Sequence, residues 1–356
     1  MIQNNEFDDD SLRERISNLI DIANEREIPL TDVQSVHRSV KNSLSARNFD
    51  KLKGKLHTEF DVEKLALLEE RLNHLVMSHI QFDDKAILFV TDLNISELET
   101  QLEDFFTHDD SSIELNYSKF AKIDLEGDKI LYQFCITKEI SLRQKLSPND
   151  LNDNIADDYQ EVIGIKKIPI ICHDFILLDH KADRAIVGVD LAMVLGANDL
   201  NISKINFLNF IKRQFGISLI DRTINLFPKI EEFYNLPFDK LNGVIEIYFL
   251  TPAGTAHHEI LKSGSVDIRT SQYHNSGVKG VRNEQSDGQP LNNDITPYRI
   301  TTRFYSKDSN TKDIDISLKS NYQAIHTEGG SQLFDAQIYG TRNINDLNFV
   351  IEKLIG

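Results

Sequence analysis

The chain has few of the features that usually indicate a protein's compartment. It has only two cysteines, Cys135 and Cys172, and each lies in an apolar run typical of a strand. We therefore expect buried thiols rather than a disulfide framework or a cysteine-bound zinc ion. No stretch approaches the roughly 20 uninterrupted apolar residues of a membrane helix, so we expect no membrane partner. The start of the sequence lacks the basic residues and apolar run of a secretory signal, which predicts a cytoplasmic protein.

The motifs of several common enzyme classes are also missing. The sequence has no His-Glu-x-x-His pattern, no Gly-x-Ser-x-Gly pattern and no dinucleotide-binding fingerprint. A binding or assembly protein is therefore favoured over an enzyme, and we expect no cofactor and no metal site.

The composition is that of an ordinary globular protein. The chain has 356 residues, of which 40% are hydrophobic and 27% are charged, and this length suggests two domains or three small ones. The net charge of −17 argues against uniform wrapping by nucleic acid. A local basic surface remains compatible with it.

Residues 1–80 are predicted to be helical. Apolar residues recur at spacings of three and four, and Asp61 can cap one of the helices. These helices are amphipathic, so each needs an apolar surface to cover it. We expect that surface to come from the rest of the chain, from a protein partner or from a second copy of the chain.

The rest of the chain mixes strand and helix patterns, so the predicted fold class is α+β, with largely antiparallel sheets. A polar, acidic segment suggests a linker between two mixed α/β modules. A long segment rich in Gly, Ser, Asn, Gln and Asp, residues 262–297, is predicted to be an irregular loop. The predicted organisation is a helical region at 1–80, a small module at 81–145, a linker at 146–160 and a C-terminal domain at 161–356.

Residues 262–312 carry the clearest charge asymmetry in the chain. This segment holds eight basic and five acidic residues, a net charge of +3, so the remainder carries −20. Aromatic and imidazole side chains lie between these charges. Arginines beside stacking rings are typical of contact with a phosphate backbone or a single strand. A solvated, moderately basic loop without a ligand is the alternative.

The candidate anion-binding residues come from this segment. Arg299 and Arg303 are predicted to share one face of a strand, which is either an anion-binding face or the solvated side of the sheet. Residues 277–280 form a Gly-x-x-Gly element whose backbone N–H groups could approach a phosphate. The candidate residues for binding nucleic acid or another anion are Arg269, Lys279, Arg282, Arg299, Arg303, Tyr273, His274 and Tyr305.

A metal-dependent nuclease or phosphodiesterase is the rival hypothesis. Asp179 and Lys181 match the second half of a nuclease pattern, with Asp174 as the first carboxylate. The spacing of five residues is short for two metal ligands, and a turn explains these residues more simply. His257 and Glu259 form a second candidate pair, because alternate residues of a strand share a face.

Two further groups are compatible with a cation. Asp313 and Asp315 alternate with isoleucines, so both carboxylates face one side of a strand, where solvent is the simpler partner. His74 and His79 lie on or beside the apolar stripe of a helix, where a packing role is the default.

We therefore predict a non-catalytic binding or assembly protein that contacts an anionic partner, nucleic acid first, through residues 262–312. The N-terminal helices would bind a protein partner or a second copy of the chain. A prokaryotic nucleic-acid-handling or antiviral genome-defence complex is the expected setting. The alternatives are the metal-dependent nuclease or phosphodiesterase and a pure protein–protein scaffold.

Overall fold

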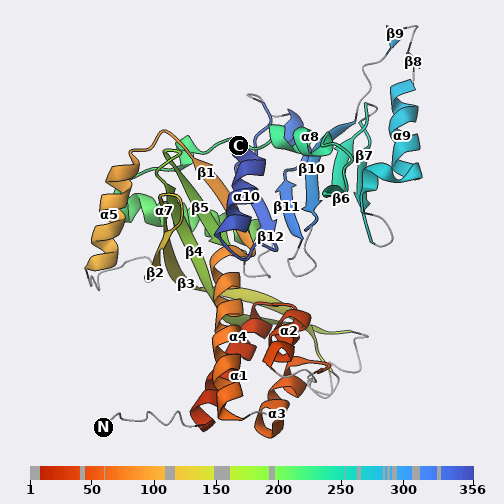
Figure 1. The fold of residues 1–356 in the computed structure, drawn as a ribbon. Helices are drawn as coiled ribbons and strands as arrows, with labels where there is room; N and C mark the ends of the chain where they lie inside the picture. The colour runs from red at the N-terminus through yellow and green to blue at the C-terminus, as the bar shows by residue number, and fades with distance from the viewer. Residues whose placement is uncertain are drawn as a thin grey trace. The chain divides into compact units, whose positions relative to one another are not determined.

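A computed structural model shows an α+β protein, which confirms the predicted fold class (Figure 1). No described helix is long and apolar enough to cross a membrane. Much of the predicted linker lies outside the described residues. So do Lys307 and Lys312, which are two of the eight basic residues of segment 262–312. The structure describes residues 9–40, 45–59, 61–108, 117–147, 161–191, 197–252, 254–262, 266–283, 285–286, 289–290, 295–306, 313–326 and 330–356.

The chain divides into two compact units. Unit 1 comprises residues 1–85 and 225–356, and unit 2 comprises residues 86–224. This division differs from the one suggested by the sequence. The segment that the sequence marks as a linker lies between strands β3 (Lys129–Lys145) and β4 (Ile163–Asp179), which pair with each other along their full lengths. It therefore connects two strands of unit 2 rather than two domains.

The N-terminal helices form a bundle with a core of its own. Asp61 caps α4 as predicted, since its side chain accepts a hydrogen bond of 2.9 Å from the backbone N–H of Lys64. The apolar stripes face one another, with Ile16, Leu68 and Leu72 fully buried. The chain thus covers these stripes itself. The helices are α1 (Asp9–Glu25), α2 (Leu30–Val40), α3 (Phe49–Glu59) and α4 (Val62–Phe82).

The second part of unit 1 is an antiparallel sheet with strand order β12-β11-β10-β6-β7. Helices α8 (Pro228–Tyr234) and α10 (Ile344–Ile355) cover one of its faces. The ring of Phe304 on β10 lies 5.9 Å from that of Phe233 on α8 and 5.3 Å from that of Phe349 on α10. The strands are β6 (Asn242–Leu250), β7 (Ala256–Ile260), β10 (Thr296–Phe304), β11 (Ile314–Lys319) and β12 (Ala336–Tyr339).

Unit 2 has the strand order β2-β3-β4-β5-β1, with helices α5 and α7. A tight turn joins β2 and β3, and Gly127 and Asp128 both adopt positive φ there. Phe134 on β3 packs against Phe207 and Phe210 of α7. The remaining bounds are β1 (Lys85–Val90), β2 (Ser118–Leu125), β5 (Arg184–Asp190), α5 (Ile95–Thr107) and α7 (Ala197–Phe215).

The segment predicted to be an irregular loop contains a helix, α9 (Gln272–Asn283), so that part of the prediction is wrong. The side chain of Ser271 accepts a hydrogen bond of 3.1 Å from the backbone N–H of His274, which caps the helix. His274 and Val278, four residues apart, are both buried. These contacts outweigh the low helix propensity of two glycines. Short pieces are β8 (Gln285–Ser286), β9 (Gln289–Pro290), η2 (Ile220–Arg222), η3 (Ile268–Thr270) and η4 (Tyr322–His326).

Candidate functional site

One face of the unit 1 sheet carries a line of polar side chains that crosses four strands. Arg299 on β10 is paired with Tyr248 on β6 and with Lys319 on β11, and Tyr248 is paired with His258 on β7. Directly opposed residues place their side chains on the same face of a sheet. We call this line the cationic row, and it consists of His258, Tyr248, Arg299 and Lys319.

Arg299 and Lys319 are incompletely neutralised. Within the described part of the chain, Glu246 is the only ion-pair partner of Arg299, at 3.6 Å, and Arg299 Nε is buried without a hydrogen-bond acceptor. Lys319 Nζ lies 3.4 Å from the hydroxyl of Tyr339, and no described carboxylate is within ion-pair distance. Burial lowers the pKa of Lys319, and the neighbouring Arg299 guanidinium lowers that pKa further, while the charges of Glu246 and Asp335 oppose part of this decrease. An anion between the two side chains would relieve this repulsion.

Aromatic rings extend the cationic row toward solvent. The ring of Tyr248 lies 4.6 Å from the Arg299 guanidinium carbon. On β7, the imidazole of His258 stacks on Tyr248 with a centroid separation of 3.9 Å and an interplanar angle of 11°. The side chain of His258 is 40% exposed. Flat rings beside a guanidinium are the groups on which nucleic-acid bases stack.

Arg303 shares the face of Arg299, as the alternation predicts, but it is engaged by a carboxylate. Its Nε and Nη2 atoms each donate a hydrogen bond of 2.7 Å to Asp315 on the neighbouring strand. This bidentate pair raises the pKa of Arg303. Arg303 is therefore poorly placed to bind a second anion.

Arg269 is a buried structural residue with an exposed fraction of only 3%. All five of its guanidinium N–H groups have acceptors inside the protein. These acceptors are the carboxylate of Asp267, the amide oxygen of Asn242 and the backbone carbonyls of Tyr234 and Leu236. The structure thus leaves Arg269 no donor for the predicted anion.

Tyr273 and His274 belong to a different surface, a groove of about 790 Å³ between β7 and α9. Tyr273 is 81% exposed. His274 is buried, with Nδ1 3.0 Å from Glu259 and Nε2 3.0 Å from the hydroxyl of Tyr234. His257 and Glu259 both line this groove, so the expectation that they share a face is confirmed.

The last three predicted residues are Tyr305, Lys279 and Arg282, of which only Tyr305 has a described side chain. The hydroxyl of Tyr305 donates a hydrogen bond of 2.6 Å to the backbone carbonyl of Val266. Lys279 and Arg282 belong to α9, and their side chains lie outside the described residues. Their part in binding an anion stays a prediction.

The structure separates the residues of the nuclease hypothesis. Asp174 and Asp179 are five residues apart on strand β4, so their side chains point to opposite faces. Asp174 is buried in a network with Tyr117 at 2.9 Å and Lys138 at 3.4 Å. Asp179 pairs with Lys129 and Arg184. No observation brings the two carboxylates to one metal.

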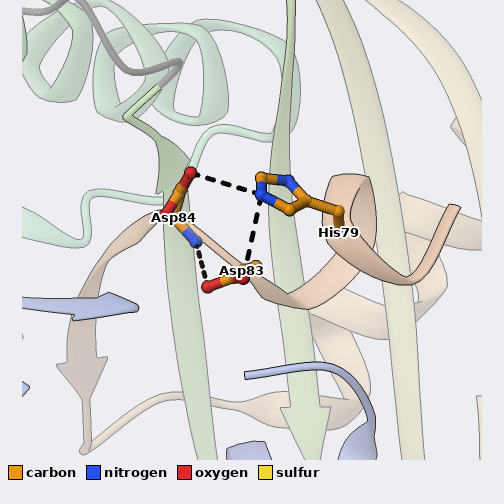
Figure 2. Close-up of side chains that lie close together, drawn as sticks. All are labelled: His79, Asp83 and Asp84. Atoms are coloured by element: carbon orange, nitrogen blue, oxygen red, sulfur yellow. Dashed lines mark hydrogen bonds and ion pairs between the residues drawn. The ribbon is translucent and has the colours of Figure 1, made fainter. Parts of the chain in front are cut away.

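A second polar site lies where α4 ends and β1 begins. His79, Asp83 and Asp84 point toward one another there (Figure 2). The Nε2 atom of His79 is 3.7 Å from Asp83 Oδ2 and 3.4 Å from Asp84 Oδ2. One potential ligand atom from each residue lies within 4.8 Å of the others. Imidazole and carboxylate together form a ligand set for a divalent cation.

A pocket of about 220 Å³ opens over this cluster. Asp313 and Asp315, whose alternation in the sequence suggests that they share one face, line the pocket together with Glu27 and Tyr339. Burial and the charge of Asp84 raise the pKa of Tyr339 to about 12, and the Arg299 guanidinium opposes this increase. Tyr339 is thus within electrostatic range of both the cluster and the cationic row.

The sequence alone did not single out Lys319, Asp83 or Asp84. Alternation along β11 could have found Lys319, because Ile314, Ile316 and Leu318 point to the buried face. The spacing of four residues between His79 and Asp83 could have placed both on one side of the helix end. Neither signal indicates which distant segments of the chain lie next to these residues in the fold.

Comparison with models of known protein families and with curated proteins found no match. The fold alone therefore defines the class of protein, an α+β protein with an antiparallel sheet in each unit.

Proposed function

We propose that this protein binds an anionic partner, nucleic acid first, through the cationic row of unit 1. The observation that carries the proposal is the pairing of Arg299 with Lys319 on adjacent strands without a carboxylate to neutralise both. Two side chains that repel each other in the free protein gain from an anion placed between them. Part of the binding free energy would come from the removal of that repulsion.

Single-stranded nucleic acid suits this surface better than a duplex. The row offers one cationic pair and the stacked rings of Tyr248 and His258, which supply one phosphate contact and one stacking position. The net charge of −17 disfavours an extended electrostatic footprint. A short contact to a phosphate and an unpaired base is consistent with both facts.

The proposed setting is a prokaryotic nucleic-acid-handling or genome-defence complex in the cytoplasm. The acidic composition of the chain supports this proposal. The N-terminal helices remain the proposed surface for a protein partner or a second copy. Their main apolar stripes are already covered, so such a contact would use their polar faces and the few apolar side chains left exposed, such as Val62 and Leu67.

Fluorescence anisotropy with labelled oligonucleotides tests the proposal. The probes are a 20-nucleotide single-stranded DNA, the matching RNA and the DNA duplex, each measured over a series of salt concentrations. The variants are Arg299→Met and Lys319→Met, which keep an unbranched aliphatic side chain and remove the charge. Lys353→Met is the matched control, because Lys353 lies over the rings of Phe304 and Phe349 on the opposite face of the sheet.

We expect the wild-type protein and the Lys353→Met variant to bind the single strands with the same affinity. Arg299→Met and Lys319→Met should each weaken binding about 10-fold, in line with the loss of roughly 1–3 kcal/mol per contact. Absence of binding at low salt by the wild type would contradict the proposal. Equal affinity for all four proteins would show that nucleic acid binds elsewhere on the chain.

A further inference from the structure

The junction between α4 and β1 holds a side-chain cluster that the proposed function does not use. His79 and Asp83 are separated by one helical turn and lie on the same side of the helix end. Asp84 follows at a positive φ of 51°, which brings its carboxylate back toward the imidazole. We infer that His79, Asp83 and Asp84 form a binding site for a divalent cation.

The distances fit a coordination shell. Nitrogen and oxygen ligands at the usual bond lengths from zinc lie about 3.4 Å from each other in a tetrahedral site. The imidazole Nε2 atom of His79 is 3.4 Å from one carboxylate and 3.7 Å from the other. One ligand atom from each of the three residues lies within 4.8 Å of the others.

Backbone contacts already orient one of the carboxylates. Asp83 Oδ1 accepts hydrogen bonds from the backbone N–H of Gly340 and, at 2.9 Å, from that of Asp84. Its other oxygen, Oδ2, faces His79. Fixing a ligand through its second oxygen is how proteins orient metal ligands before the metal binds.

Acidic side chains surround the cluster. Glu27, Asp313 and Asp315 line the pocket above it, and no lysine or arginine is among the described lining residues. Asp315 is also paired with Arg303 at 2.7 Å. A divalent ion would offset several of these negative charges together.

The ligand chemistry selects the class of ion. Imidazole with carboxylates suits first-row cations such as Zn²⁺ and Mn²⁺ better than Ca²⁺, which prefers a shell of oxygens alone. The pocket volume of about 220 Å³ leaves space for water molecules to complete the shell. Zn²⁺ and Mn²⁺ are therefore the probes to use.

Isothermal titration of the metal-free full-length protein with Zn²⁺ and with Mn²⁺ tests this inference. The variant is Asp84→Asn, because asparagine keeps the size and tolerates a positive φ while losing the charge. Asp104→Asn is the matched control. Asp104 also lies four residues before a histidine near a helix end, at 3.1 Å from His108, but this pair is exposed and belongs to no group of three potential metal ligands among the described residues.

We expect one equivalent of metal to bind to the wild-type protein and to Asp104→Asn, and on the order of 10-fold weaker binding to Asp84→Asn. Failure of the wild type to bind either ion at millimolar concentration would overturn the inference, as would equal affinity of Asp84→Asn. If Asp84→Asn does not fold, the NMR signals of the histidine rings of the wild-type protein test the site instead. Added Zn²⁺ should shift the resonances of His79 and leave those of His108 unchanged, and the opposite pattern would overturn the inference.

Discussion

Arg299 and Arg303 occupy the same face of β10 and have different neighbours on the adjacent strand. The two arginines are four residues apart, so alternation places both on that face. Arg303 lies opposite Asp315 and forms a bidentate ion pair, whereas Arg299 lies opposite Lys319. The residue across the strand therefore decides which arginine can bind an external anion.

The Arg303–Asp315 pair should contribute to stability rather than to binding. A double-mutant cycle with Arg303→Ala and Asp315→Ala, measured by urea denaturation, should give a coupling energy of about 1 kcal/mol, because solvent screens a pair of which one side chain is more than a third exposed. Arg303→Ala should retain most of its affinity for a single-stranded probe. A loss of affinity as large as that of Arg299→Met would contradict this assignment.

Asp174 of unit 2 should be among the most sensitive positions of the chain. It accepts a hydrogen bond from Tyr117, lies beside Lys138 and accepts a 2.8 Å hydrogen bond from the backbone N–H of Asp190. Asp174→Asn removes the charge of a fully buried carboxylate opposite the partly buried Lys138 and should lower the free energy of unfolding by about 3 kcal/mol or more. Urea denaturation measures this change. Glu139→Gln is the control, because Glu139 on β3 forms an exposed ion pair with Lys167, and it should change stability by less than about 0.5 kcal/mol. Equal losses of stability in the two variants would contradict the structural role of Asp174.

At the scale of elements, α2 should make the helical bundle sensitive to acid. His37 is fully buried on this helix, and burial lowers its pKa below the usual 6.5. As the pH falls below about 6.5, the unfolded chain takes up a proton that the folded chain resists, so stability is present above this pH and is lost below it.

Urea denaturation between pH 5 and pH 8, followed by circular dichroism, measures this dependence. The wild type should lose up to about 1.4 kcal/mol per pH unit from this group below pH 6.5. His37→Gln should show a smaller slope, and His74→Gln, at an exposed position on α4, should keep the wild-type slope. Identical slopes for wild type and His37→Gln would contradict the assignment.

Local sequence signals predicted most of the elements. The strand predicted to carry Arg299 and Arg303 is β10, and the predicted cap at Asp61 was confirmed. Helix α9 was missed, because two glycines hide a helix whose stability comes from a serine cap and two buried side chains. Propensity is a weak guide where tertiary contacts decide.

The sites were only partly predictable, because their residues meet through distant pairings. Alternation placed Arg299 and Arg303 on one face, but it did not identify Lys319 as the neighbour on the next strand. The backbone N–H that holds Asp83 belongs to Gly340, which is 257 residues further along the chain. Arg269 looked free in the sequence, and only the fold shows its five acceptors.

For the whole molecule, the division into two compact units predicts that unit 2 can fold without unit 1. Unit 2 is one continuous segment, residues 86–224, with an aromatic core between β3 and α7. This segment expressed alone should fold and show one cooperative urea transition by circular dichroism. A fragment ending at residue 145 removes β4 and β5 and should not fold. Absence of a cooperative transition in the 86–224 fragment would contradict this division.

The whole chain is acidic, so the proposed affinity for an anion depends on a small local surface rather than on net charge. In the proposed complex, Arg299 and Lys319 contact the same anion. Lys319 reports on this directly, because burial and the Arg299 guanidinium lower its pKa in the free protein.

The most direct test is an NMR titration of the Lys319 side chain in the full-length protein, with and without a saturating single-stranded oligonucleotide. We expect a Lys319 pKa below the usual lysine value in the free protein and a higher pKa in the complex, because a bound phosphate favours the charged form. Replacing Arg299 by Met should also raise the pKa of Lys319 in the free protein. An unchanged Lys319 pKa in a saturated complex would rule out an anion beside this side chain.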